Sequence, residues 1–179
     1  HAAAVGESER LRERLSADLP GGDLPADSAV WLQQREQEWT QWRQREAELH
    51  RVREAAAAVG QALAADVLER DRANAEPFAE VGLLRQAGLI NLLVPTEFGG
   101  QGGHWESALE AVRIVSRADG SIGQLLAYHY INQASIAFYA PAQEQGRWWE
   151  LAAKNQWLWA DSVNPTDPDL ILTPTATGW

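Results

Sequence analysis

The sequence has 179 residues, of which 45% are hydrophobic, and a formal net charge of −10 at pH 7. This length accommodates one domain, with or without an appendage. So acidic a balance argues against binding to nucleic acid or to an anionic membrane surface, because both need clustered Lys and Arg. Cysteine is absent, which excludes disulfides, thiolate metal sites and cysteine nucleophiles.

The sequence carries no recognisable signal for export, membrane insertion or metal binding. A basic start followed by an apolar run is missing, and no apolar run approaches the length needed to cross a bilayer. We therefore expect a cytoplasmic protein that does not bind membranes. The four histidines show no metal-ligand spacing, so we expect no metal. Methionine is absent even at position 1, and we expect this chain to be a fragment.

The first region is rich in Arg, Glu, Gln and Ala and predicts a helical hairpin. Residues 4–18 are helical in composition, and the Pro and Gly residues of 20–25 then break the helix. A second helix is predicted from Ala29 to about Arg70. Its apolar residues recur in steps of three and four, which is typical of a hairpin or a coiled coil. This stripe comprises Leu32, Trp39, Trp42, Leu49, Val52, Ala56, Val59 and Leu63.

The second region has shorter elements separated by Gly and Pro. A helix begins at Pro77 and stops at Gly88, and an apolar run that we expect to be extended then ends at Pro95. The glycines of 96–103 could be read as a phosphate-binding loop, but the Lys that such a loop needs is missing. We therefore predict a tight turn here. Further helices are predicted over 104–118, from Asp119 or Ser121 to 139, and from Pro141 onward, followed by strands over 157–163 and 170–176.

Four segments, in this order, resemble the acyl-CoA dehydrogenase family. They are ERDRANAEP, LLVPTEFGGQGG, RADGSIGQLLAYHY and NQWLWADSVNPTDPDL, and the resemblance covers about residues 55–179. The implied fold class is mainly α: the N-terminal helical domain of the acyl-CoA dehydrogenase fold, preceded by a helical hairpin and followed by the first strands of a β domain. The expected divisions are a hairpin or coiled-coil-like extension (1–54), the helical domain (55–155) and the truncated β domain (156–179).

The branch that the sequence resembles most is that of the dibenzothiophene and dimethyl sulfone monooxygenases. That resemblance implies a flavin-dependent oxidoreductase in which reduced FMN, supplied by a separate flavin reductase, reacts with oxygen so that a small organosulfur compound is oxygenated. It implies FMN rather than FAD, and a homo-oligomer, usually a tetramer. The alternative within the family is an FAD-dependent acyl-CoA dehydrogenase, whose catalytic Glu would lie beyond Trp179.

The resemblance places the substrate pocket at Gln124, Tyr128 and His129. A Tyr hydroxyl can donate a hydrogen bond to a substrate oxygen while its ring packs against the substrate. His129 points about 100° around the helix from Tyr128, which favours a structural histidine. Gln124 stands where the dibenzothiophene enzymes have a pocket His, and Gln cannot transfer a proton near neutral pH. This departure favours a different, small sulfur substrate.

The resemblance places flavin contacts at Asp161, Ser162, Val163 and Asn164. A second reading of these four residues is a strand end and a turn, because Asn-Pro and Asp-Pro dipeptides form turns. A function of another class is also open. Residues 1 to about 50 have the texture of a coiled-coil arm, so the chain could be a structural or interaction fragment, or a fusion, without activity of its own.

Overall fold

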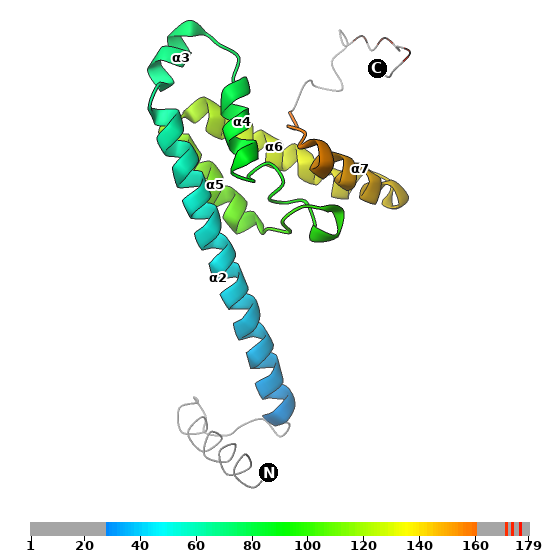
Figure 1. The fold of residues 1–179 in the computed structure, drawn as a ribbon. Helices are drawn as coiled ribbons and strands as arrows, with labels where there is room; N and C mark the ends of the chain where they lie inside the picture. The colour runs from blue at the N-terminus through cyan, green and yellow to red at the C-terminus, as the bar shows by residue number, and fades with distance from the viewer. Residues whose placement is uncertain (1–27, 161–170, 172, 174–175, 177–179) are drawn as a thin grey trace. The chain divides into compact units, whose positions relative to one another are not determined.

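The computed structural model describes residues 28–160 together with 171, 173 and 176. Six α-helices and one short 3-10 helix, and no strand, lie within these residues (Figure 1). None of the described helices is long and apolar enough to cross a membrane. The elements are α2 (Ser28–Ala64), α3 (Val67–Ala73), α4 (Phe78–Gln86), η1 (Thr96–Phe98), α5 (Trp105–Ala118), α6 (Gly120–Tyr139) and α7 (Ala142–Asn155).

The chain forms two compact units, residues 1–46 and residues 47–179. We call the described residues Ser28–Glu46 the N-terminal extension and the described residues 47–160 the helical domain. The division falls within α2, a few residues before the boundary at 54 that the sequence predicts. The first arm of the predicted hairpin, 4–18, lies outside the described residues.

Helix α2 ends earlier than the sequence predicts. It stops at Ala64, the chain turns over residues 65–66, and α3 begins at Val67. Arg70 explains the break, because its guanidinium donates to the Leu63 carbonyl (2.9 Å) and to the Asp66 carboxylate (2.7 Å). A carbonyl in the last turn of α2 thus obtains the partner that a continuing helix would have supplied.

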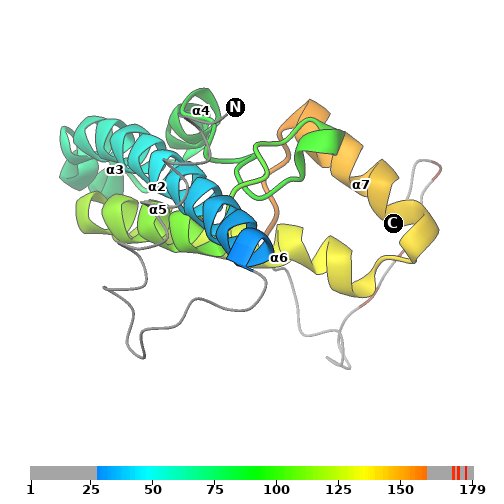
Figure 2. The ribbon, with the colours of Figure 1, turned by 90° about the horizontal axis from the view of Figure 1, so that it is seen from below.

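The core of the helical domain is built on the second half of the predicted apolar stripe. Leu49, Val52, Ala56, Val59 and Leu63 are all buried. Four of them pack in one cluster with apolar residues of α5 and α6. Both ribbon views show α5 lying along this part of α2 (Figures 1 and 2). The members of the cluster that α5 and α6 supply are Ala108, Ala111 and Val115 of α5 and Ile122, Leu126 and Tyr130 of α6.

The apolar run after α4 is a buried series of turns, and our prediction of an extended segment is wrong there. Its residues Leu89, Ile90, Leu92 and Val94 are at most 1% exposed. No strand pairs with it in the described structure, so its carbonyl oxygens accept hydrogen bonds from other groups. Tyr130 and His129 donate to Leu89 and Ile90, and the glycine loop donates to Leu92 and Val94. Buried backbone groups must find partners, and here they find them outside a sheet.

The glycine-rich stretch is the tight turn that the sequence predicts. Gly99 has φ +87°, in the left-handed region that favours glycine. A Cβ at Gly100 would lie 2.0 Å from the Val94 carbonyl oxygen, so only glycine permits this close return of the chain. The amides of Gly102 and Gly103 then donate to Val94 and Leu92 at 2.8 Å.

The last two helices, α6 and α7, begin at residues that the sequence marks. Asp119 caps α6 by accepting from the amides of Ser121 (3.0 Å) and Ile122 (3.1 Å). Pro141 precedes α7, and Gln156, directly after the end of α7, is in a left-handed conformation. The strand predicted over 157–163 is irregular chain in its described part, 157–160. The rest of that strand and most of the second strand lie outside the described residues.

Candidate functional site

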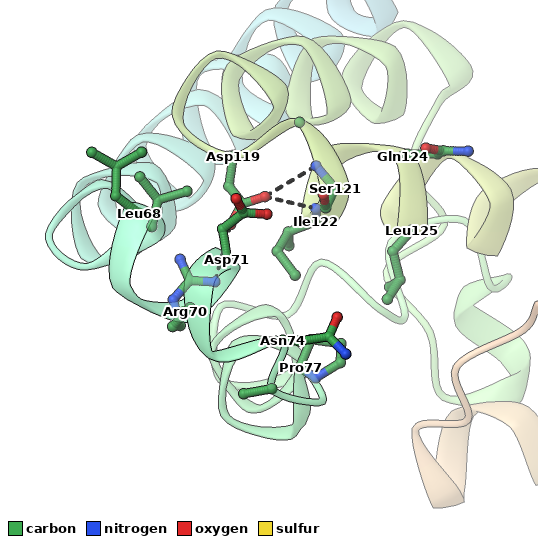
Figure 3. A pocket seen from close by; sticks show the side chains of 13 residues that line it. Leu68, Arg70, Asp71, Asn74, Pro77, Asp119, Ser121, Ile122, Gln124 and Leu125 are labelled. Atoms are coloured by element: carbon green, nitrogen blue, oxygen red, sulfur yellow. Dashed lines mark hydrogen bonds and ion pairs between the residues drawn. The ribbon is translucent and has the colours of Figure 1, made fainter.

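A cavity of about 540 Å³ lies between α3 and the first turns of α6 (Figure 3). The sequence-predicted pocket residue Gln124 lines it, with Leu125 beside it. Figure 3 shows the Gln124 amide pointing away from the charged wall that Arg70 and Asp119 form. The other lining residues are Val67, Leu68, Asp71, Asn74, Ala75, Pro77, Gly120, Ser121 and Ile122.

The charged wall of this cavity is an ion-pair network around Arg70. Its guanidinium lies 2.7 Å from Asp66, 3.4 Å from Glu80 and 3.0 Å from Asp119, and its side chain is only 19% exposed. The hydrogen bond to Asp66, opposed by burial and supported by Asp119, raises the pKa of Arg70. Because Asp119 also caps α6, the network fixes α3, α4 and the start of α6 together. The charge of Arg70 is therefore already matched by three carboxylates.

Tyr128 lies one helical turn beyond Gln124 on the same face of α6, because residues four apart share a face. Its side chain is 44% exposed. The structure therefore brings two of the three predicted pocket residues to one surface, where both residues are exposed.

His129 lies on another face, fully buried. Its Nε2 lies 2.8 Å from the Ile90 carbonyl oxygen, and its Nδ1 lies 3.1 Å from the Trp159 amide nitrogen. A carbonyl only accepts and an amide N–H only donates, so the ring is the neutral tautomer with its proton on Nε2. Burial, opposed by the Ile90 contact, lowers the pKa of His129 to about 4. In this arrangement neither ring nitrogen faces a substrate.

Two buried donors near these residues were not predicted from the sequence. The Asn132 side-chain nitrogen and the Trp159 indole N–H have no acceptor within the described structure. Asn132 follows Tyr128 by four residues, so its place on the Tyr128 face could have been found from helical spacing. Trp159 is held beside α6 by its bond to His129, which no sequence spacing reveals. Unsatisfied buried donors are rare, and each calls for an acceptor outside the described residues, such as a water, an ion, a ligand or another segment of the chain.

The predicted flavin contacts Asp161, Ser162, Val163 and Asn164 lie outside the described residues. The described chain reaches Ala160, and the last described aromatic side chain before them is Trp159. Within the described residues, no three His, Asp or Glu side chains gather as a metal site would require.

The model of the acyl-CoA dehydrogenase N-terminal domain matches residues 44–156. The chain belongs to this family. The match begins close to the start of the helical domain and ends at the end of α7, so the family assignment covers the helical domain and leaves most of the N-terminal extension outside.

Two curated relatives are monooxygenases. A probable FMNH2-dependent monooxygenase, SfnC, of Pseudomonas putida is 34% identical over 105 residues, which cover 59% of this chain and 27% of that protein. Dibenzothiophene monooxygenase of Rhodococcus erythropolis is 37% identical over 120 residues, 64% of this chain and 28% of the relative. The chain thus spans little more than a quarter of the length of these relatives.

Solved structures of the same kind share the fold. FMN-bound TdsC of Paenibacillus sp. A11-2 superposes with a TM-score of 0.61 at 31% identity, over 72% of this chain and 34% of the other. The methanesulfinate monooxygenase MsuC of Pseudomonas fluorescens gives 0.61 at 30% identity, over 64% of this chain and 30% of the other. The fold predicted from the sequence, the N-terminal helical domain of this family, is confirmed.

The described residues suit the flavin that these relatives imply. The isoalloxazine ring of a flavin offers several acceptor atoms along one edge, and the Asn132 amide and Trp159 indole are buried donors without acceptors in the described structure. Tyr128 adds a hydroxyl on the same face as Asn132. These donors suit the acceptor atoms of such a ring, whereas the side-chain oxygens of Asn91 and Gln133, which also lack partners within the described residues, need a donor instead.

Proposed function

We propose that the complete protein is a reduced-flavin monooxygenase that uses FMN and oxygenates a small organosulfur compound. The observation that carries this proposal is the identity of 34–37% to two monooxygenases through the same helical domain. The names of the relatives point to sulfur compounds of different sizes, dibenzothiophene and methanesulfinate. Reduced FMN would supply the electrons for oxygen activation.

Within this proposal, α6 provides the substrate side of the site. The Tyr128 hydroxyl would donate a hydrogen bond to the oxygen that the substrate carries or gains, and the exposed ring would pack against the substrate. Gln124 would hydrogen-bond a polar substrate group at the cavity between α3 and α6 without exchanging a proton. We assign His129 a structural role, because both of its nitrogens hold backbone groups.

The flavin side would combine the two unpartnered donors, Asn132 and Trp159, with Asp161, Ser162, Val163 and Asn164 as further contacts. A separate flavin reductase would deliver reduced FMN, which places both proteins in one compartment, and we propose the cytoplasm. We also propose assembly as a homo-oligomer, a tetramer by analogy with the family.

The decisive experiment mixes the complete protein with chemically reduced FMN, ¹⁸O₂ and either dibenzothiophene or methanesulfinate. We expect mass spectrometry to find one ¹⁸O atom per turnover in the sulfur product. Tyr128→Phe should lower kcat/KM by about tenfold, the value of one good hydrogen bond. Tyr139→Phe is the matched control, because Tyr139 lies on the same helix and is 86% exposed.

The same preparation also tests the alternative function. If acyl-CoA substrates reduce bound FAD rapidly while no labelled sulfur product forms, the protein is a dehydrogenase and the proposal is wrong. Equal losses in Tyr128→Phe and Tyr139→Phe would remove Tyr128 from the site while leaving the reaction itself in place.

A further inference from the structure

The N-terminal extension carries an exposed aromatic surface that the family assignment does not explain. Trp39 and Trp42 are 56% and 51% exposed, and their rings stack with centroids 4.8 Å apart. Together with Arg35 and Glu38 they line a hollow of about 610 Å³. Contiguous exposed aromatic area of this kind marks an interaction surface.

The other face of the same helix is polar. Gln33, Glu36, Gln37, Thr40 and Gln41 surround a separate hollow there. The exposed Trp pair is therefore confined to one side of the extension, where Arg35 and Glu38 accompany it, while the other side is polar. Only the side of the helix that carries Trp39 and Trp42 would therefore be buried against a partner.

The spacing of the aromatic face follows a heptad. Leu32, Trp39 and Glu46 fall seven apart at position a, and Arg35 and Trp42 fall seven apart at position d. In this seam two consecutive Trp are flanked by Arg35 on one side and Glu46 on the other, and the order of these opposite charges restricts the partner.

We propose that the N-terminal extension is a dimerisation helix that pairs antiparallel with the same helix of a second copy. The two-fold axis would pass between Thr40 and Gln41. In that register Trp39 packs against the partner's Trp42 and Arg35 meets the partner's Glu46. Each of these layers occurs twice because of the symmetry.

The flanking charges agree with this register. In an antiparallel pair of helices the e positions face each other, as do the g positions. The e pair is Glu36 with the partner's Arg43, and the g pair is Glu38 with the partner's Arg45. Both are attractive, and flanking pairs of this type set the orientation of coiled coils.

A parallel in-register dimer of the same helix is disfavoured by its seam. It would place Arg35 against the partner's Arg35 and Glu46 against the partner's Glu46. Like charges in a seam are repulsive, and this repulsion selects against the parallel arrangement. The seam charges thus favour the antiparallel orientation over the parallel one.

The energetic balance predicts a weak, concentration-dependent dimer. Arg35 now pairs with Glu38 within the chain, but both side chains are at least half exposed. Exposed pairs contribute about 1 kcal/mol or less, so exchanging them loses little. Four Trp would each bury about 150–250 Å², a total below the roughly 1,200–2,000 Å² of stable interfaces. The helix itself needs no new nucleation, since α2 continues into the buried core of the helical domain.

Sedimentation velocity of the 179-residue chain over a range of concentrations tests the dimer. We expect a reversible monomer–dimer equilibrium that the double variant Trp39→Gln/Trp42→Gln abolishes. Trp105→Gln is the matched control, because Trp105 is also exposed (47%) but lies on α5. Circular dichroism at low concentration should show that all three proteins stay helical.

A charge exchange tests the register. Glu38→Arg should raise the dissociation constant at least about tenfold, because it places a second guanidinium against the partner's Arg45. Adding Arg45→Glu in the same chain should restore the dimer, because the two opposite charges meet again across the symmetry axis. Positions 38 and 45 do not face each other in a parallel dimer, so rescue identifies the antiparallel register.

The absence of cysteine allows a direct reading of orientation by spin labels at single introduced cysteines. Gln33→Cys labels should lie about 20 Å farther apart along the helix axis than Gln41→Cys labels, given a rise of about 1.5 Å per residue. Similar separations at the two sites would mean a parallel dimer and overturn the proposal. So would a monomer at every concentration, in which case residues 1–27 of the same chain become the candidate cover, or a dimer that the Trp replacements leave intact.

Discussion

The two halves of α2 follow one apolar rhythm but have opposite environments. Leu49, Val52 and Leu63 are 7%, 2% and 1% exposed in the helical domain. Trp39 and Trp42, on the same stripe in the N-terminal extension, are half exposed. Periodicity thus predicts that a residue belongs to the apolar face of a helix, but burial depends on what packs against that face.

This difference indicates that the buried half of α2 stabilises the fold and that the exposed half is available for association. Substitutions in the buried half should act on the free energy of unfolding, whereas substitutions in the exposed half should act on self-association and leave the fold intact. Each of the following experiments compares a buried group with an exposed one of the same chemical type.

The largest effect is expected for truncation along the stripe. Leu63→Ala should lower the free energy of unfolding by about 2–5 kcal/mol, because it leaves a cavity in the core of the helical domain. Trp39→Ala should change it by less than about 0.5 kcal/mol at concentrations where the chain is monomeric. Urea unfolding followed by circular dichroism measures both. If both variants lost a similar free energy of unfolding, Trp39 would be buried in solution, and the contrast between the two halves of α2 would be wrong.

The next effect concerns two arginines with acidic partners. Arg70→Met should destabilise the helical domain by about 3 kcal/mol, since it strands the buried Asp119 and Glu80 carboxylates. Arg35→Met removes the exposed pair with Glu38 and the contact of the guanidinium with the Trp31 ring, and it should cost less than about 1 kcal/mol. The thermal midpoint of each variant, taken at the same dilution, provides the measurement. An undiminished midpoint for Arg70→Met would show that the network contributes little.

The smallest effect depends on pH and compares a buried histidine with an exposed one. Unfolded His129 takes up a proton below its usual pKa of 6.5, whereas folded His129 does so only near pH 4. Between these two pKa values the unfolded state binds more protons than the folded state, so it becomes relatively more stable as the pH falls. The free energy of unfolding should therefore drop by about 2 kcal/mol between pH 7 and pH 5. Denaturation curves at both pH values should show His129→Gln lacking this drop. His50→Gln, whose side chain is 74% exposed, should keep it.

Much of the helical domain could be predicted because its signals are local. Asp119 before a helical run and Pro141 before another are short-range markers, and the structure places both at helix starts. The end of α2 could not be predicted, because Arg70 reaches back to the Leu63 carbonyl, a contact that depends on the tertiary arrangement. The prediction of an extended run over 89–95 is wrong for a similar reason. The backbone of this run is satisfied by α6 side chains, which propensity does not reveal.

For the candidate site, helical spacing predicts which residues of α6 share a face, but it does not predict what surrounds each face. Tyr128 and His129 lie on different faces of α6, as adjacent helical residues must. The environment of each face comes only from the structure: Tyr128 is exposed, and His129 contacts two backbone segments. Gln124 and Tyr128 as substrate contacts, and Asp161, Ser162, Val163 and Asn164 as flavin contacts, remain predictions.

The His129 ring has a consequence beyond its low pKa. One edge donates to the Ile90 carbonyl and the other accepts from the Trp159 amide, so the imidazole links two peptide groups that never touch. In a β-sheet those groups would pair directly as a rung of the ladder. Here a side chain serves as the rung and holds the two stretches of main chain farther apart than a sheet would. In the described part of the domain, a side chain thus connects distant segments of backbone as hydrogen bonds between strands would, although these residues contain no β-sheet.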